Sequence, residues 1–174
     1  MRAAWLSSLL LLAAAGVEAH SASDAYLTLT VDPPAPGGTA PLTAHGQWDI
    51  ALRDLDFVLG LDDDGDGRVT WRELKRHQAA IERYAYPGLA VRGGAANRCA
   101  IKPTRQLVDG HADGAYAALF FEVRCARPAR SLTIDYTMFF AVDPSHRGIF
   151  VLQSGQNVST AVLSPEHATI EVAL

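Results

Sequence analysis

Alternate acidic residues within a twelve-residue window give this chain its most specific chemical signal. Residues 62–73 read Asp-Asp-Asp-Gly-Asp-Gly-Arg-Val-Thr-Trp-Arg-Glu, which matches the spacing of an EF-hand calcium loop. Ca²⁺ takes roughly six to eight oxygen ligands, and short carboxylates on alternate residues supply them as a chain wraps around the ion. The predicted ligands at loop positions 1, 3, 5, 7, 9 and 12 are Asp62, Asp64, Asp66, the backbone carbonyl of Arg68, Thr70 and Glu73.

Two other residues in the window and its flanks also fit a calcium loop. Gly67 at position 6 permits the left-handed backbone of a sharp turn, and Val69 at position 8 supplies an apolar anchor. Apolar residues at three-to-four spacing predict helices over residues 51–61 and 70–85. The sequence therefore predicts a helix–loop–helix that binds calcium, and the alternative is a solvated acidic turn.

We do not expect a second calcium loop. Residues 109–114, Asp-Gly-His-Ala-Asp-Gly, imitate the first half of one, but position 12 would be Phe120, so a hairpin turn is expected there. A lone EF-hand must be braced by the rest of its domain or by a partner, and the groove-opening mechanism of paired sensor EF-hands is not expected. A structural site fits better, because extracellular calcium fills even sites with dissociation constants of roughly 10⁻⁴–10⁻³ M.

Short runs of β-branched and aromatic residues, separated by turn-forming residues, predict about nine strands. These predicted strands cover residues 23–31, 42–50, 89–92, 98–108, 116–125, 131–142, 148–153, 158–163 and 168–174. The pattern predicts a mostly β fold, an antiparallel Ig-like β-sandwich. The EF-hand helix–loop–helix would be an excursion at about residues 51–85, between the second and third strands.

The amino terminus has the pattern of a cleavable signal peptide over residues 1–19. Arg2 gives a positive n-region, an apolar stretch covers residues 3–17, and Val-Glu-Ala at 17–19 is a small-x-small cleavage site. The alternative is a membrane anchor, but the apolar stretch is shorter than the roughly 20 residues that span a bilayer. We therefore expect one mature β-sandwich domain over residues 20–174, secreted to the periplasm or the extracellular space.

The two cysteines, Cys99 and Cys125, fit an oxidising compartment. Each lies in a predicted strand, so a disulfide between neighbouring strands is geometrically plausible. Such a bridge would contribute on the order of 3 kcal/mol to stability. The alternatives are two free buried thiols or a pair of metal ligands, although neither cysteine has a CxxC partner.

Charge and missing motifs disfavour two classes of function. The formal net charge is −4 and the sequence has no basic stripe, so we do not expect nucleic-acid binding. The sequence has no GxSxG, P-loop, HExxH or CxxC motif. Four residues could converge in a catalytic site, but such groups at strand ends and turns are usually solvated or capping: Asp135, Asp143, His146 and Glu166. We therefore expect no enzyme.

Four segments occur in a characteristic order: residues 23–27 (SDAYL), residues 48–56 (WDIALRDLD), the calcium loop, and residues 135–148, from Asp-Tyr to His-Arg-Gly. Together they resemble the extracytoplasmic N-terminal region of bacterial membrane proteins of the HupE/UreJ type. In such proteins the soluble domain is followed by several membrane helices. The resemblance implies a bacterial extracytoplasmic domain whose partner is a membrane protein, or a membrane domain encoded downstream.

A transition-metal role is the main alternative function. Cleavage after Ala19 would expose His20, whose amine and imidazole together chelate Cu²⁺ or Ni²⁺. Five other histidines could complete such a site, though none shows HxH or HxxxH spacing: His45, His77, His111, His146 and His167. The leading prediction is an extracytoplasmic calcium-binding module whose ion organises the EF-hand into a partner-binding surface. The alternative is periplasmic copper or nickel binding or delivery through His20.

Overall fold

The computed structural model describes residues 23–33, 40–94 and 97–174, which form strands around one helical segment. The strands are β1 (Asp24–Val31), β2 (Thr43–Ala51), β3 (Leu89–Arg92), β4 (Ala100–His111), β5 (Gly114–Arg124), β6 (Ser131–Tyr136), β7 (Arg147–Ser154), β8 (Asn157–Leu163) and β9 (Thr169–Ala173). Between β2 and β3 lie α1 (Leu52–Leu59), α2 (Trp71–Arg76), α3 (Gln78–Ala85) and the 3₁₀ turn η1 (Tyr86–Gly88). The predicted mostly β fold with a helical excursion after the second strand is confirmed.

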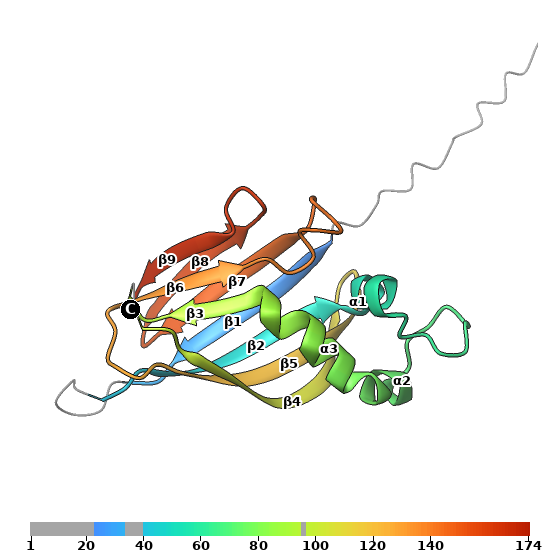
Figure 1. Ribbon diagram of the computed structural model, residues 1–174, viewed down its shortest axis with the longest axis horizontal. Helices are drawn as coiled ribbons and strands as arrows, with labels where there is room; N and C mark the ends of the chain where they lie inside the picture. Colours follow the sequence, from blue (N-terminus) through green and yellow to red (C-terminus); the bar gives the residue numbers. More distant parts are fainter. Residues whose placement is uncertain (1–22, 34–39, 95–96) are drawn as a thin grey trace, which may run out of the picture.

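The strands form two sheets that lie one over the other (Figure 1). The larger sheet has the strand order β4-β5-β2-β1-β7-β8, and the smaller one has the order β3-β6-β9. Most neighbouring pairs are antiparallel, but β1 and β7 run parallel, with Ala25 opposite Gly148. The prediction of an entirely antiparallel sandwich is wrong at this pair. No hairpin joins β1 to β7, so no tight turn dictates their relative direction.

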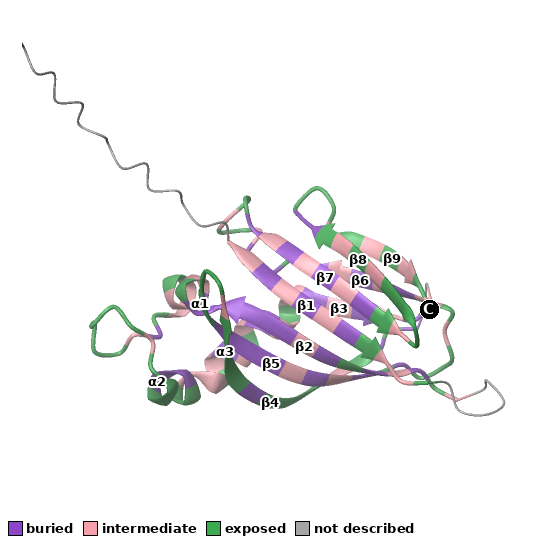
Figure 2. Cartoon of the chain, turned by 180° about the vertical axis from the view of Figure 1, so that it is seen from behind, coloured by how far each residue is buried: buried purple, intermediate pink, exposed green. Residues whose placement is uncertain are grey.

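One face of each sheet is buried in a shared core, as the alternating bands in Figure 2 show. On β1, Leu27 and Leu29 are fully buried while Tyr26 and Thr28 are partly exposed, because successive side chains of a strand point to opposite faces. Ile134 on β6 faces the same core. Trp48 of the larger sheet meets Tyr136 of the smaller one edge-on, with ring centroids 5.6 Å apart. The two sheets therefore form a sandwich with one apolar interior.

The smaller sheet covers only part of the larger one, and the helices cover much of the rest (Figure 1). Ile81 and Ala85 of α3 are fully buried members of the core. The ring of Tyr86, in η1, meets Phe121 of β5 edge-on at 5.9 Å between centroids and Trp48 of β2 at 6.4 Å. Because these contacts bury apolar area, the helical excursion is part of the hydrophobic core and not an appendage.

The helix predicted over residues 70–85 is divided into α2 and α3 at His77. His77 has φ −89° and ψ 3°, which ends the regular α-helix, while its N–H still donates to the carbonyl oxygen of Glu73 at 2.9 Å. The prediction of one continuous helix is wrong here. The backbone changes direction only a little at His77, so apolar residues keep a spacing of three to four on both sides of it and the sequence shows no break. The other predicted helix, over residues 51–61, is α1 and stops before Gly60.

The strand predicted over residues 131–142 ends at Tyr136, and turns follow it. The prediction fails because neither neighbour continues: the β3 ladder ends opposite Tyr136 and the β9 ladder ends opposite Asp135. In the turns, Phe139 has φ 62°, a left-handed conformation that is unusual for a bulky residue. Aromatic and β-branched composition therefore indicated a strand where no partner strand exists.

The predicted disulfide between Cys99 and Cys125 is present. Cys99 lies directly before β4 and Cys125 directly after β5, and these two strands are neighbours in the larger sheet. At their other ends the same strands are joined by the predicted hairpin turn, where His111 pairs with Gly114. A structural disulfide is typical of compartments outside the cytosol, which agrees with the predicted oxidising environment.

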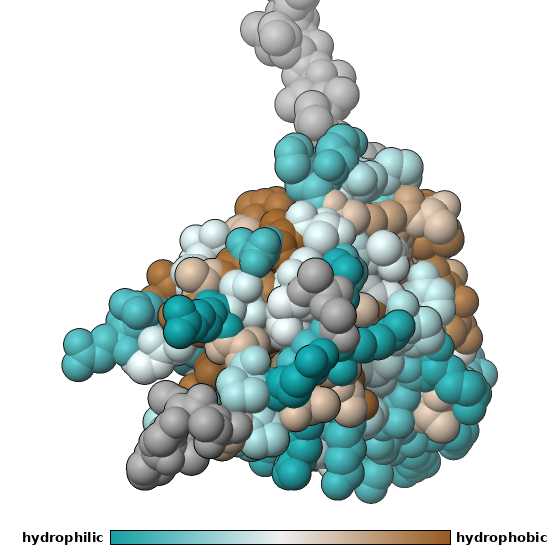
Figure 3. All heavy atoms as spheres, turned by 60° about the vertical axis from the view of Figure 1, so that its left-hand side comes forward, coloured by the Kyte–Doolittle hydropathy of each residue, from teal (hydrophilic) through white to brown (hydrophobic). Residues whose placement is uncertain are grey.

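Across the described ranges, no helix combines the length and the apolar character needed to cross a membrane. The end of the sandwich remote from the helices, shown in Figure 3, is covered largely by hydrophilic residues, with smaller hydrophobic groups between them. The predicted signal peptide, residues 1–19, and His20 lie outside the described residues.

Candidate metal centre

The predicted calcium loop connects α1 to α2 at the helical end of the molecule (Figure 1). Helix α1 is capped by Gly60, which has φ 61° and donates its N–H to the carbonyl oxygen of Asp56 at 2.7 Å. The Asp56 carboxylate then accepts the N–H groups of Leu61 at 2.6 Å and Asp62 at 2.9 Å. Because Leu61 is fully buried, the chain is held firmly where the loop begins. Asp56 is a positioning residue outside the EF-hand spacing, and the sequence analysis missed it.

The first loop position, Asp62, organises the turn around its own carboxylate. Its two oxygens accept the N–H groups of Gly65 at 2.8 Å, Asp66 at 3.2 Å and Gly67 at 2.7 Å. The bond from Gly67, followed by those from Gly65 and Asp66, lowers the pKa of Asp62. Gly65 and Gly67 have φ values of 71° and 82°, so the left-handed backbone predicted at Gly67 is confirmed and Gly65 shares it.

One carboxylate oxygen from each of Asp62, Asp64 and Asp66 lies within 4.8 Å of the other two. Asp66 accepts the N–H of Arg68 at 2.8 Å, and Asp64 accepts the N–H of Asp66 at 3.3 Å. That last bond lowers the pKa of Asp64, but the negative charge of Asp66, desolvation and the charge of Glu73 raise it more, so the net shift is upward. The cluster is therefore a place where negative charges repel one another and where a cation would relieve the repulsion.

Glu73, at the twelfth position, is anchored by the start of α2. Thr70 caps this helix: its hydroxyl accepts the N–H of Glu73 at 3.4 Å and donates to the Glu73 carboxylate at 2.7 Å. The other carboxylate oxygen accepts the N–H of Asp63 at 3.0 Å, which ties the end of the loop back to its beginning. The side-chain bond from Thr70, with a second from its N–H, lowers the pKa of Glu73. Glu73 is only 5 % exposed.

The structure brings three of the six predicted ligands into one cluster and places the others around it. Asp62, Asp64 and Asp66 form the cluster, and the Glu73 carboxylate lies against the same loop. The Thr70 hydroxyl is engaged in capping α2, and the side chain of Arg68 turns to a neighbouring cavity. The candidate metal ligands are all oxygen atoms and the carboxylates are close together, which fits a hard divalent cation such as Ca²⁺.

Asp63, at the second loop position, holds α2 and the junction between α2 and α3 against the loop. The Asp63 carboxylate pairs with the guanidinium of Arg76 and lies 2.9 Å from Nε2 of His77. The hydrogen bond with His77 is the main influence that lowers the pKa of Asp63, and Arg76 lowers it further. The residue at which α2 ends is thus in contact with the loop.

The sandwich braces the predicted calcium loop. Val69, at the eighth position, packs against the core, and Leu74 of α2 is a fully buried member of it. The side-chain amide of Gln106, on β4, donates to the carbonyl oxygen of Leu74 at 3.4 Å. The larger sheet therefore supports the helical segment that carries the loop.

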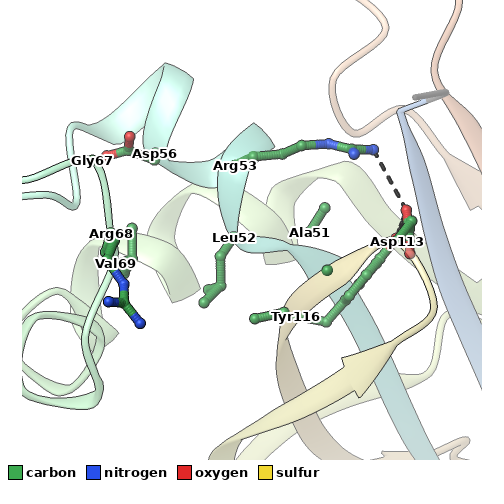
Figure 4. A pocket seen from close by; sticks show the side chains of 11 residues that line it. Ala51, Leu52, Arg53, Asp56, Gly67, Arg68, Val69, Asp113 and Tyr116 are labelled. Carbon is green, nitrogen blue, oxygen red and sulfur yellow. Dashed lines mark hydrogen bonds and ion pairs between the residues drawn. The ribbon is translucent and has the colours of Figure 1, made fainter. Parts of the chain in front are cut away.

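A cavity of about 440 Å³ separates the loop from the β4–β5 hairpin (Figure 4). Gly67, Arg68 and Val69 form one wall, and residues 113–116 form the other. Arg53 of α1 crosses above it to Asp113, with 3.7 Å between the charged atoms.

The residues considered for catalysis have local structural partners. Asp135 pairs with Arg92 at 2.9 Å. Asp143 and Glu166 each accept hydrogen bonds from a serine two residues away along the chain. His146 is fully buried. These contacts are those of turn-capping and core groups.

Comparison with known proteins gives no match to any family model, and no curated protein matches the chain. The resemblance to HupE/UreJ-type proteins therefore stays a prediction that is carried by the four segments alone.

Proposed function

We propose that this chain is an extracytoplasmic calcium-binding module, an Ig-like sandwich that carries one EF-hand helix–loop–helix. Ca²⁺ would be held by Asp62, Asp64, Asp66, the Arg68 carbonyl, Thr70 or a water on it, and Glu73. The ion would offset the repulsion between the carboxylates and fix α1 relative to α2. The calcium-bound helices would then present a rigid surface to a partner.

One observation carries this proposal. One carboxylate oxygen from each of three alternate residues lies within 4.8 Å of the other two, in a loop whose twelfth residue, Glu73, is a buried carboxylate tied back to the loop. Burying a charge is costly unless it is compensated, and hydrogen bonds from Thr70 and Asp63 compensate the Glu73 carboxylate here. They hold it against the loop that carries the acidic cluster, which supports a role as the twelfth-position ligand.

The resemblance to HupE/UreJ-type proteins and the predicted signal peptide suggest the setting in which the module acts. A bacterial periplasm or extracellular space contains enough calcium to fill a weak structural site. The partner would be a membrane protein, or a membrane domain encoded downstream. The disulfide supports a setting outside the cytosol.

Thermal unfolding of the mature protein, with EDTA or with about 10 mM calcium, tests the proposal. For a dissociation constant of roughly 10⁻⁴–10⁻³ M, binding to the native state alone adds about 1.4–2.7 kcal/mol. For a domain of this size that corresponds to a rise in Tm of roughly 3–10 °C. Glu73→Gln removes the bidentate ligand and should abolish most of this rise.

Glu171→Gln is the matched control, because Glu171 is an exposed carboxylate on β9, far along the chain from the loop. It should keep the full calcium response. An equal response of Tm in the wild type and in Glu73→Gln would refute the proposal, as would no response to calcium in the wild type.

A further inference from the structure

A second group of metal-ligating side chains lies on the outer face of the larger sheet. Asp49 is on β2, while Asp109 and His111 are on β4, and their candidate ligand atoms all lie within 4.8 Å of one another. Asp49 points away from the core because its neighbours Trp48 and Ile50 are fully buried core residues. The group therefore lies on the face opposite the core and is made of residues outside the calcium loop.

The sheet brings these residues together across a small side chain. Strand β5 lies between β2 and β4, and its residue opposite Asp49 is Ala118. Ala118 is also opposite Leu107, two residues before Asp109 on β4. Because alanine fills little space above the sheet, side chains from β2 and β4 can meet over β5. Sequence spacing alone gives no sign of this contact.

The imidazole of His111 is held in a fixed orientation by two tyrosine rings. It stacks on Tyr26 with 4.6 Å between centroids and 17° between planes, and it lies 4.2 Å from the ring of Tyr116. Its Nε2 is 3.4 Å from Oδ2 of Asp49. A charge-assisted hydrogen bond is shorter, about 2.7–2.9 Å. Two ligands bound tetrahedrally to one ion at about 2.1 Å lie roughly 3.4 Å apart.

The Asp49 carboxylate is buried without a permanent positive charge. It is only 7 % exposed, and the neutral side-chain amide of Gln47 donates to its two oxygens at 2.9 Å and 3.1 Å. The titratable groups that act on it are the imidazole of His111 and the carboxylate of Asp109. A buried carboxylate is costly unless it pairs with a cation or binds a metal. Gln47 orients the carboxylate as outer-shell groups do around metal ligands.

We propose that Asp49, Asp109 and His111 form a second cation site, specific for a divalent transition metal ion such as Zn²⁺. One imidazole nitrogen and two carboxylates suit ions of intermediate softness, whereas calcium prefers oxygen ligands only. Water or a group from a partner would complete the coordination. This site is independent of the calcium loop, so either site can exist without the other.

Isothermal titration of the mature protein with Zn²⁺, in calcium-containing buffer, tests the site. All proteins carry His20→Ala, which removes the imidazole that could chelate a metal ion together with the amino-terminal amine. His111→Gln and Asp109→Asn should each weaken Zn²⁺ binding at least tenfold. His45→Gln is the matched control, because it removes an exposed histidine of β2 that pairs with Asp32. It should bind Zn²⁺ as the wild type does.

A spectroscopic readout separates coordination from indirect effects on the fold. Cu²⁺ bound to the protein should show EPR coupling to one imidazole nitrogen, which His111→Gln should remove and Glu73→Gln should retain. Wild-type Zn²⁺ affinity in His111→Gln or in Asp109→Asn would overturn the proposal. Absence of Zn²⁺ binding to the wild type at millimolar concentration would also overturn it, while leaving the calcium proposal untouched.

Discussion

Replacing His146 with glutamine tests a dependence of stability on pH that the buried imidazole creates. His146 is fully buried, and its Nε2 accepts the hydroxyl of Tyr136 at 2.7 Å. Its Nδ1 lies 2.7 Å from Oγ of Ser23, whose own proton is donated to the Asp54 carboxylate at 2.9 Å. Ser23 therefore accepts from Nδ1, and the imidazole fits this chain of hydrogen bonds in its neutral form.

Burial lowers the pKa of His146 from 6.5 to about 4, an effect that Asp143 opposes and Arg147 supports. As pH falls below 6.5 the imidazole of the unfolded chain takes up a proton, while the native imidazole stays neutral until about pH 4. The unfolded state then binds more protons, so stability is full above pH 6.5, falls between 6.5 and about 4, and levels off below. Between pH 7 and pH 5 the loss is about 2 kcal/mol.

Urea unfolding near pH 7 and near pH 5, monitored by tryptophan fluorescence, measures this loss as a difference between proteins. The wild type should lose about 2 kcal/mol more than His146→Gln over this interval. Both proteins share the same carboxylates, so their titration cancels in the comparison. His167→Gln, which removes an exposed histidine, should retain the wild-type slope. The same pH dependence in His146→Gln as in the wild type would refute the reasoning.

Two further predictions concern the packing of the sandwich. A Cβ at Gly46 would lie 2.1 Å from the ring of Phe121, so Gly46→Ala should lower the free energy of unfolding in urea by roughly 1–3 kcal/mol. Gly110→Ala has nothing within 4 Å and should change it by less than about 0.5 kcal/mol, so equal losses would contradict this packing. Replacing Cys99 and Cys125 with serine should cost roughly 2–5 kcal/mol in the same assay, and added reductant should then have no further effect. An unchanged urea midpoint in the double variant would rule out a stabilising disulfide.

The features that the sequence predicted well are local. The turn at Gly67 follows from a glycine at a fixed position among alternate acidic residues, and its left-handed φ of 82° depends on few other parts of the chain. The number and order of the strands follow from short alternating runs and the turns between them. The disulfide between Cys99 and Cys125 could be predicted because the two cysteines were expected on neighbouring strands.

The features that the sequence did not predict depend on distant partners. Asp56 holds the start of the calcium loop by hydrogen bonds to Leu61 and Asp62, which no spacing rule includes. The strand predicted beyond Tyr136 fails because its neighbours end there. The meeting of Asp49 with His111 depends on the strand order, which a sequence pattern does not specify.

The parallel pairing of β1 with β7 has a consequence for how the chain reaches its native state. Strand β2 follows β1 closely in the chain and can pair with one of its edges early. The other edge of β1 pairs with β7, which ends at Ser154. A chain that emerges amino terminus first must therefore keep an unpaired edge at the centre of its main sheet until most residues have appeared. Such edges attract other strands and aggregate. We expect the nascent protein to depend on a holding chaperone, and to fold in one late step and not piece by piece.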